Sequence, residues 1–231
     1  MRKKTLPLLV SLAALLAAGA AQAASGIPYS DLPDWSGDWV VQPFKDAAPV
    51  YKADWLEKHK AKPGAKKADD PIKTCGIFAG TPRNLGMSGI HEWIITQGAV
   101  RHALENDFNS VQRIFTDGRA HIDADVVTPS YTGDNIGHWE GDILVIDTVA
   151  LRDDTWLDDV GHEHSDQLHI TTWVQKLADG RLQAQAQVED PVAFAKPWTI
   201  TRYYKRLPAG SFVHDYACGI ITSGAQAEKI H

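Results

Sequence analysis

Cysteine and long apolar segments are scarce in this sequence of 231 residues. Its two cysteines belong to no Cys-x-x-Cys pair, so the sequence does not indicate a thiol-based redox centre. Beyond the first 23 residues, no apolar run is long enough to span a bilayer. The chain also lacks a Gly-x-Ser-x-Gly nucleophile elbow and a glycine-rich phosphate loop. These absences exclude an α/β-hydrolase and disfavour a nucleotide cofactor.

Basic and apolar residues are grouped at the N-terminus. Residues 2–4 are basic, residues 6–20 are almost all apolar, and residues 21–23 read Ala-Gln-Ala, a small-x-small cleavage pattern. This order predicts a secretory signal peptide over residues 1–23 and export to the periplasm. Removing three basic residues and no acidic residue changes the formal charge from −6 to −9. A chain this acidic disfavours nucleic acid and anionic membrane surfaces as partners, and no membrane insertion is expected.

The two cysteines, Cys75 and Cys218, are 143 positions apart. In an exported protein, two cysteines without catalytic or metal-binding spacing are expected to form a disulfide. This bond would tie the front of the core to the last strand. In the chain-entropy model, closing so long a loop stabilises a fold by roughly 3–5 kcal/mol.

Short alternating segments separated by turn residues dominate the chain from residue 90 onward. Asp117-Gly118 and Asp179-Gly180 are typical hairpin turns. After a first strand that starts at 34–39, strands are expected at 90–96, 99–106, 110–115, 131–139, 143–149, 168–176, 182–188, 198–206 and 212–218. The pattern predicts an all-β fold, a single antiparallel lipocalin-like β-barrel of about 8–10 strands. Closure removes the exposed sheet edges and leaves an interior for one small ligand.

Residues 42–89 show no β pattern and are predicted to form a long excursion that serves as a loop or lid. A short helix from Asp54 through Lys60 is expected within it. Residues 24–218 then form a single barrel domain, and the small, polar residues 219–231 form a flexible tail. Two tryptophans at the first strand, Trp35 and Trp39, are expected either to plug one end of the barrel or to join its core.

The stretch Ile136–Asp147 predicts the clearest β-hairpin of the chain. Glu140-Gly141-Asp142 supplies the turn, because glycine and aspartate accept turn conformations that β-branched residues resist. The returning strand is apolar on both faces until Asp147, so both of its sides are expected to be covered. His138 is expected at the end of the first arm.

Six segments carry a distinctive pattern. They are Gly80-x-Pro82, Arg113-Ile-x-x-Asp-Gly-Arg119, Gly133-Asp-x-Ile-Gly-His-Trp-Glu-Gly-Asp-x-Leu-Val-x-Asp-Thr148, His164-Ser-Asp-x-Leu168, Glu189-Asp-Pro191 and Lys196-Pro-Trp198. Together they resemble a large family of exported bacterial proteins over about residues 70–218. The resemblance implies a shared fold and no particular activity. The expected barrel also resembles lipocalin-like folds, among them the cofactor-free phenolic acid decarboxylases, an analogy of fold only.

The chain departs from this family pattern in two places. Ala150-Leu151 stands where the family often has Gly-Phe, and Thr172-Trp173 stands where a Glu-Arg pair is common. Both departures lie beside the expected pocket, so they indicate a changed substrate.

Histidines and carboxylates are concentrated between residues 138 and 169. The cluster comprises His138, Glu140, Asp147, His162, His164, Asp166 and His169. In one interpretation these are acid–base residues of a metal-free enzyme, because an imidazole beside a carboxylate moves protons near neutral pH. The predicted catalytic residues are then His138, Asp147, His164, Glu105 and Arg113.

Two other interpretations of the cluster stay open. His138, His162 and His164 could complete a metal site, since His-x-His spacing places two imidazoles on one side of an extended segment. Alternatively, His138 and Asp147 are structural, and the loop 150–166 is an acidic surface with Asp158, Asp159 and Asp166 as surface or turn residues. In that case the protein is a binding barrel or a structural module.

Eight tryptophans and six tyrosines are many for this length and favour a flat aromatic ligand. The predicted substrate-binding residues are Trp93, Trp139, Trp156, Trp173, Tyr131 and Arg101. The leading hypothesis is a cofactor-independent lyase that acts on a small aromatic compound, such as a lignin- or plant-derived phenolic, by deformylation or decarboxylation. The alternatives are a periplasmic binding barrel for an aromatic ligand and a metal-dependent enzyme. A homodimer is compatible with either.

Overall fold

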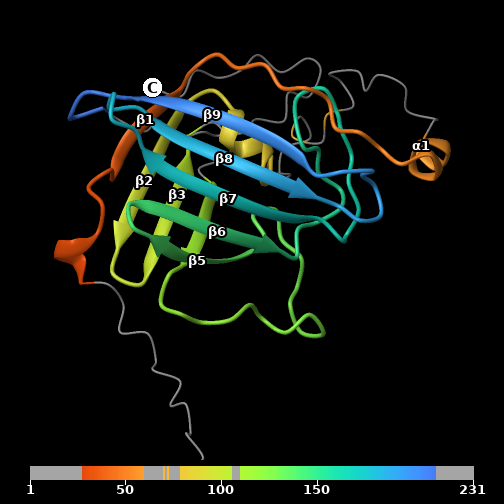
Figure 1. Cartoon of the computed structure of the whole chain (residues 1–231), viewed down its shortest axis with the longest axis horizontal. Helices are drawn as coiled ribbons and strands as arrows, with labels where there is room; N and C mark the ends of the chain where they lie inside the picture. The colour runs from red at the N-terminus through yellow and green to blue at the C-terminus, as the bar shows by residue number, and fades with distance from the viewer. Residues whose placement is uncertain (1–27, 60–69, 71, 73–78, 106–109, 212–231) are drawn as a thin grey trace, which may run out of the picture.

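Alternating inward and outward side chains close this sheet into a barrel. The computed structural model describes residues 28–59, 70, 72, 79–105 and 110–211. Its strands pair in sequence order, and β9 pairs back with β1 (Figure 1), which confirms the predicted all-β barrel. The strands are β1 (Gly37–Val41), β2 (Ile90–Thr96), β3 (Ala99–Leu104), β4 (Ser110–Phe115), β5 (Asp134–Glu140), β6 (Ile143–Val149), β7 (His169–Lys176), β8 (Leu182–Glu189) and β9 (Trp198–Arg206).

The barrel is mixed and not wholly antiparallel as expected. Strands β4 and β5 run parallel, and they meet at one residue pair, Phe115 and Ile136. The other neighbouring strands are antiparallel. A parallel pair needs a long connection that carries the chain back to the same end of the sheet, and residues 116–133 form that connection.

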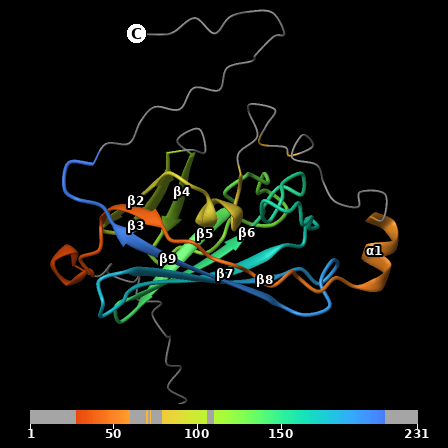
Figure 2. The same ribbon diagram turned by 90° about the horizontal axis from the view of Figure 1, so that it is seen from above.

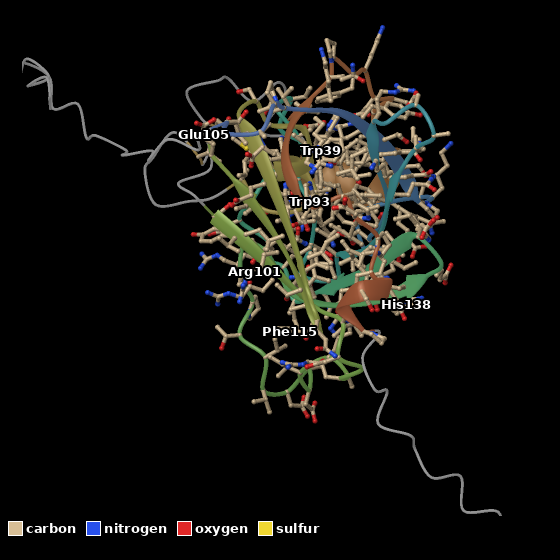
Figure 3. The ribbon with its side chains drawn as sticks, turned by 90° about the vertical axis from the view of Figure 1, so that its left-hand side faces the viewer. Trp39, Trp93, Arg101, Glu105, Phe115 and His138 are labelled. Atoms are coloured by element: carbon tan, nitrogen blue, oxygen red, sulfur yellow. The ribbon has the colours of Figure 1, made fainter. Side chains whose placement is uncertain are left out.

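Tryptophans belong to the buried core of the barrel, which agrees with one of the two predicted alternatives. Trp39 and Trp93 lie inside the wall (Figure 3) and are 0% and 1% exposed. Trp35 packs edge-on against Trp93 with ring centroids 5.7 Å apart, and it also contacts Trp139 at 5.9 Å. The indole nitrogen of Trp39 donates to the Trp35 carbonyl at 3.2 Å, which fixes the entry into β1.

Strands β2–β4 and β7–β9 face each other across the interior (Figure 2). From β1, residues 42–52 run along the barrel to α1 (Ala53–His59), which projects beyond it (Figure 1), close to the predicted helix 54–60. A short 3-10 helix, η4 (Arg83–Gly86), precedes β2, and another, η1 (Tyr29–Asp31), precedes β1. The excursion 42–89 therefore starts and ends against the barrel.

Several expectations fall outside the described residues: the signal peptide 1–23, the Cys75–Cys218 disulfide, the strand 212–218 and the tail 219–231. In the part of the chain that the structure describes, no helix is both long and apolar enough to cross a membrane.

Candidate functional site at the barrel mouth

The residues predicted to be catalytic do not meet in one place. His138 lies on β5 with its Nε2 atom 3.0 Å from Glu140 Oε1, and both side chains are more than half exposed. Arg113 is exposed on β4, directly opposite Arg101 of β3. Figure 3 shows Arg101 and His138 on different sides of the molecule. The carboxylate of Glu105 follows β3 and accepts the Ile90 backbone amide at 3.0 Å.

Asp147 also points outward, where it joins a chain of acids and imidazoles. One carboxylate oxygen contacts His169 Nε2, and the other lies 3.3 Å from His121 Nε2. His121 Nδ1 lies 2.9 Å from Asp134, on β5. The predicted cover over both faces of β6 is thus incomplete, because the Asp147 side chain is 42% exposed.

His164 is buried in the loop between β6 and β7, and its contacts are structural. Its Nδ1 donates to the Ser165 carbonyl at 2.9 Å, and its Nε2 lies 2.9 Å from the Thr155 hydroxyl. Asp190 is also buried and accepts the Ser165 amide and hydroxyl at 2.6 and 2.8 Å. It also accepts backbone amides of residues 192 and 193. Burial lowers the pKa of His164, so this neutral histidine braces its own loop, while the Asp190–Ser165 contacts tie that loop to the segment after β8.

The alternative metal site is wrong in its geometry. His138 pairs with Glu140, His164 with Thr155, and His162 with Asp158. Across the described ranges, no three His, Cys, Asp or Glu side chains are grouped as metal ligands.

The predicted aromatic residues are scattered as well. Trp93 is core, and Trp139 is partly buried against the core. Trp156 is 8% exposed with the Arg83 guanidinium 5.8 Å from its ring. Trp173 lies on β7 opposite Gln185 and is half-buried. Tyr131 lies under the Arg152 guanidinium at 4.8 Å. These residues do not form one aromatic wall.

A pocket of about 400 Å³ does occur at the mouth of the barrel. Its walls come from the segment 42–52, from η4, from the β6–β7 loop and from β9. The residues with chemical potential there are Phe44, Asp46, Arg83, Asp158, His162 and Arg202. Its volume is in the range that holds a small ligand.

Asp158 and His162 form a carboxylate–imidazole dyad in this pocket. Asp158 Oδ2 lies 2.6 Å from His162 Nδ1. The other oxygen, Oδ1, accepts the backbone amides of Val160, Gly161 and His162 at 3.0, 3.0 and 3.2 Å. Burial acts to raise the pKa of Asp158, but these hydrogen bonds outweigh it and lower the pKa.

The ionised carboxylate determines which His162 nitrogen is basic. A carboxylate only accepts, so Nδ1 of His162 carries the proton and Nε2 keeps its lone pair when the ring is neutral. Tyr51 supports the same loop, since its hydroxyl donates to the Glu163 carbonyl at 2.7 Å. The arrangement gives His162 the features of a general base held by a carboxylate.

Two buried arginines line the same pocket. Arg202 binds Asp46 in a fork, with Nη1 and Nη2 at 2.8 and 2.6 Å from the two carboxylate oxygens. The Phe44 ring centroid lies 3.5 Å from the Arg202 guanidinium. Arg83 forms a similar fork with Asp70, at 2.8 and 2.6 Å, and also contacts Asp159.

A second pair of histidines is buried inside the barrel. His91 Nε2 lies 2.9 Å from the Met87 carbonyl, so it donates there. His91 Nδ1 lies 2.9 Å from His102 Nε2, and in the neutral pair His102 is the donor. Burial lowers the pKa of His91 to about 4 and lowers that of His102. His102 Nδ1 is left as a buried acceptor without a hydrogen-bond partner in the described structure.

Sequence reasoning missed most of the mouth. The sequence predicts Asp158 only as a surface or turn residue and includes His162 in the cluster, while Arg202 and Phe44 are not among the predicted residues. One signal was available for Arg202, because it shares its strand face with Trp198, Ile200 and Tyr204, which are inward residues.

No protein-family model matches the chain, and no curated protein is similar to it. The family resemblance of the hairpin motif therefore stays a prediction.

Proposed function

We propose that this protein is a cofactor-independent lyase of the periplasm that acts on a small aromatic compound at the mouth of the barrel. The observation that supports it most is the Asp158–His162 dyad in a pocket shared with Phe44 and Arg202. A base, a group that orients it, an aromatic contact and a cation are what an acid–base elimination requires.

A deformylating elimination illustrates the chemistry. A substrate R–CH₂OH becomes R–H and formaldehyde, so no oxidant or reductant is needed. His162 Nε2 takes the hydroxyl proton, and the O–H electron pair becomes the second bond of the carbonyl as the C–C bond breaks. Where the carbon of R at the broken bond is benzylic, the electron pair of that C–C bond is delocalised into the aromatic ring, and the imidazolium returns its proton to that carbon. Asp158 stabilises the imidazolium in between.

Positive charge is available for the anion that forms on the ring. Arg202 and Arg83 line the pocket, and their side chains are only 4% and 3% exposed. A buried guanidinium stabilises a developing negative charge more strongly than one in water.

A binding barrel without turnover is the second candidate. It is favoured by the carboxylate partners that both arginines already have, Asp46 and Asp70. Such pairing reduces the net positive charge that a reacting anion meets.

The test is a turnover screen of phenolic compounds that carry hydroxymethyl or carboxyl groups, with formaldehyde and carbon dioxide release as the readout. The wild-type protein is expected to release one of these products, and His162→Gln is expected to lower kcat by about 10²–10⁴-fold. His138→Gln is the matched control, because His138 also pairs with a carboxylate but lies on the outside. Calorimetric binding without turnover would contradict the lyase and support the binding barrel.

A further inference from the structure

Arg202 is the cation of the pocket that best suits a ligand carboxylate. Its side chain is 4% exposed and is held by Phe44 on one face. Gly86 lies close on another side, because a Cβ atom there would be 2.8 Å from Arg202 Nε. The guanidinium therefore has one fixed orientation, and its fork already binds a carboxylate in bidentate geometry.

The carboxylate in that fork belongs to the segment 42–52 and not to the barrel wall. Backbone hydrogen bonds tie the ends of this segment, from the Gln42 amide to Tyr203 and from the Lys52 amide to Ala193. Between residues 43 and 49, the described structure has no backbone–backbone hydrogen bond to the barrel. The middle is held by the Asp46–Arg202 pair, by Phe44 and by the Trp198 indole, which donates to the Ala47 carbonyl at 2.6 Å.

Exchange of one carboxylate for another is electrostatically inexpensive. Removing Asp46 alone would leave a buried, unpaired guanidinium, which destabilises a protein strongly. A ligand carboxylate that enters as Asp46 leaves keeps the charge of Arg202 compensated. Arg202 Nε, which has no hydrogen-bond partner in the described structure, adds a donor that Asp46 does not use.

We propose that the ligand of this pocket is an aromatic carboxylate, whose carboxylate group replaces Asp46 on Arg202 while its ring contacts Phe44. The proposal rests on the proposed function for the location of the site, and it adds the substrate class. Asp46 then acts as an internal competitor for the ligand carboxylate.

The test uses the purified protein, isothermal titration calorimetry, and benzoate and benzamide as probes that differ in charge. Benzoate is expected to bind and benzamide is not. Asp46→Asn is expected to tighten benzoate binding by about tenfold or more, because the competing charge is gone. Asp117→Asn is the matched control, since Asp117 pairs with Arg119 at 2.5 Å on the exposed surface, and it should leave benzoate affinity unchanged.

Arg202→Lys keeps the positive charge but cannot bind a carboxylate with two parallel hydrogen bonds. Combined with Asp46→Asn, it is expected to abolish the tighter benzoate binding. If Asp46→Asn is folded by circular dichroism and binds benzoate no more tightly than the wild type, the exchange is wrong. The lyase is judged separately, by His162→Gln, which should still bind benzoate. If Asp46→Asn binds benzoate more tightly and His162→Gln keeps full turnover, the carboxylate ligand is supported and His162 is not the general base.

Discussion

Imidazole side chains occur in two opposite electrostatic settings in this protein. His91 and His102 form a pair inside the barrel, and His162 lies at its mouth. His91 and His102 face one another, and the chain of hydrogen bonds begins at a neutral carbonyl of Met87. His162 faces the ionised carboxylate of Asp158. The interior pair has no anion to compensate an added proton, whereas the Asp158 carboxylate compensates the positive charge of a proton on His162.

This difference shows why burial alone does not mark a reactive imidazole. Without a nearby anion, desolvation forces the interior histidines to stay neutral, and they contribute packing, as in the stack of Trp93 on His102 at 4.1 Å. A carboxylate held by three backbone amides supports a charged imidazole at the mouth. Of these two settings, proton transfer is therefore expected at the mouth and not at the interior pair.

The largest expected effect comes from removing the charge of Asp158. Asp158→Asn keeps the shape of the turn, but its amide offers a donor to His162 Nδ1 and favours the wrong tautomer. We expect kcat to fall by about 10²-fold or more with little change in folding. Steady-state kinetics on the substrate found by the screen measures this, and an unchanged kcat would remove the dyad from the mechanism.

A smaller effect is expected on stability at low pH. The folded pKa of His91 is about 4 and that of His102 is also lowered, whereas an unfolded histidine titrates near pH 6.5. Above that pH both states are neutral and stability is full. As the pH falls toward about 4, the unfolded chain binds protons that the folded chain rejects, so the free energy of unfolding decreases, by roughly 1–3 kcal/mol from His91 and in the same direction from His102.

Urea denaturation at several pH values measures this loss. His102→Gln removes one of the rejecting groups, so its stability should depend less steeply on pH between about 6.5 and 4 than that of the wild type. His138→Gln, at an exposed histidine, should keep the wild-type slope. Equal slopes for all three proteins would show that the interior pair accepts protons in the folded state.

The smallest effect is expected at His138. This histidine is 64% exposed and pairs with an equally exposed glutamate. His138→Ala should change the free energy of unfolding by less than about 0.5 kcal/mol and leave turnover intact. Thermal denaturation and the turnover assay check both. A loss of turnover would instead return the hairpin to the reaction, as the sequence first indicated.

The barrel was predictable because its signal is local. Strands such as Ile90–Thr96 and Ser110–Phe115 have the bounds that alternation and turn residues give them. The parallel contact of β4 with β5 was not predictable in this way. The direction of β5 depends on the path of the connection 116–133. The alternation of side chains within a strand carries no information about that path.

The mouth was harder to predict because its parts come from distant segments. Phe44, His162 and Arg202 meet only when the barrel closes. Proximity in sequence suggested the set from residues 138 to 169, which shares His162 with the mouth but whose other predicted members lie elsewhere. Some of the polar motif residues, such as Ser165 and Asp190, connect loops. These motif residues therefore serve to hold the fold together.

The single ladder pair between β4 and β5 makes this the most weakly paired place in the wall. Gly137 permits the approach, since a Cβ atom there would be 2.9 Å from Ile114. One ladder pair offers few hydrogen bonds to hold two strands together, so amides along this seam should exchange with deuterium earlier than those of the β6–β8 ladders. Mechanically, the barrel is a curled sheet that one residue pair closes at β4 and β5. We expect the opening of this seam to set how often solvent enters the interior.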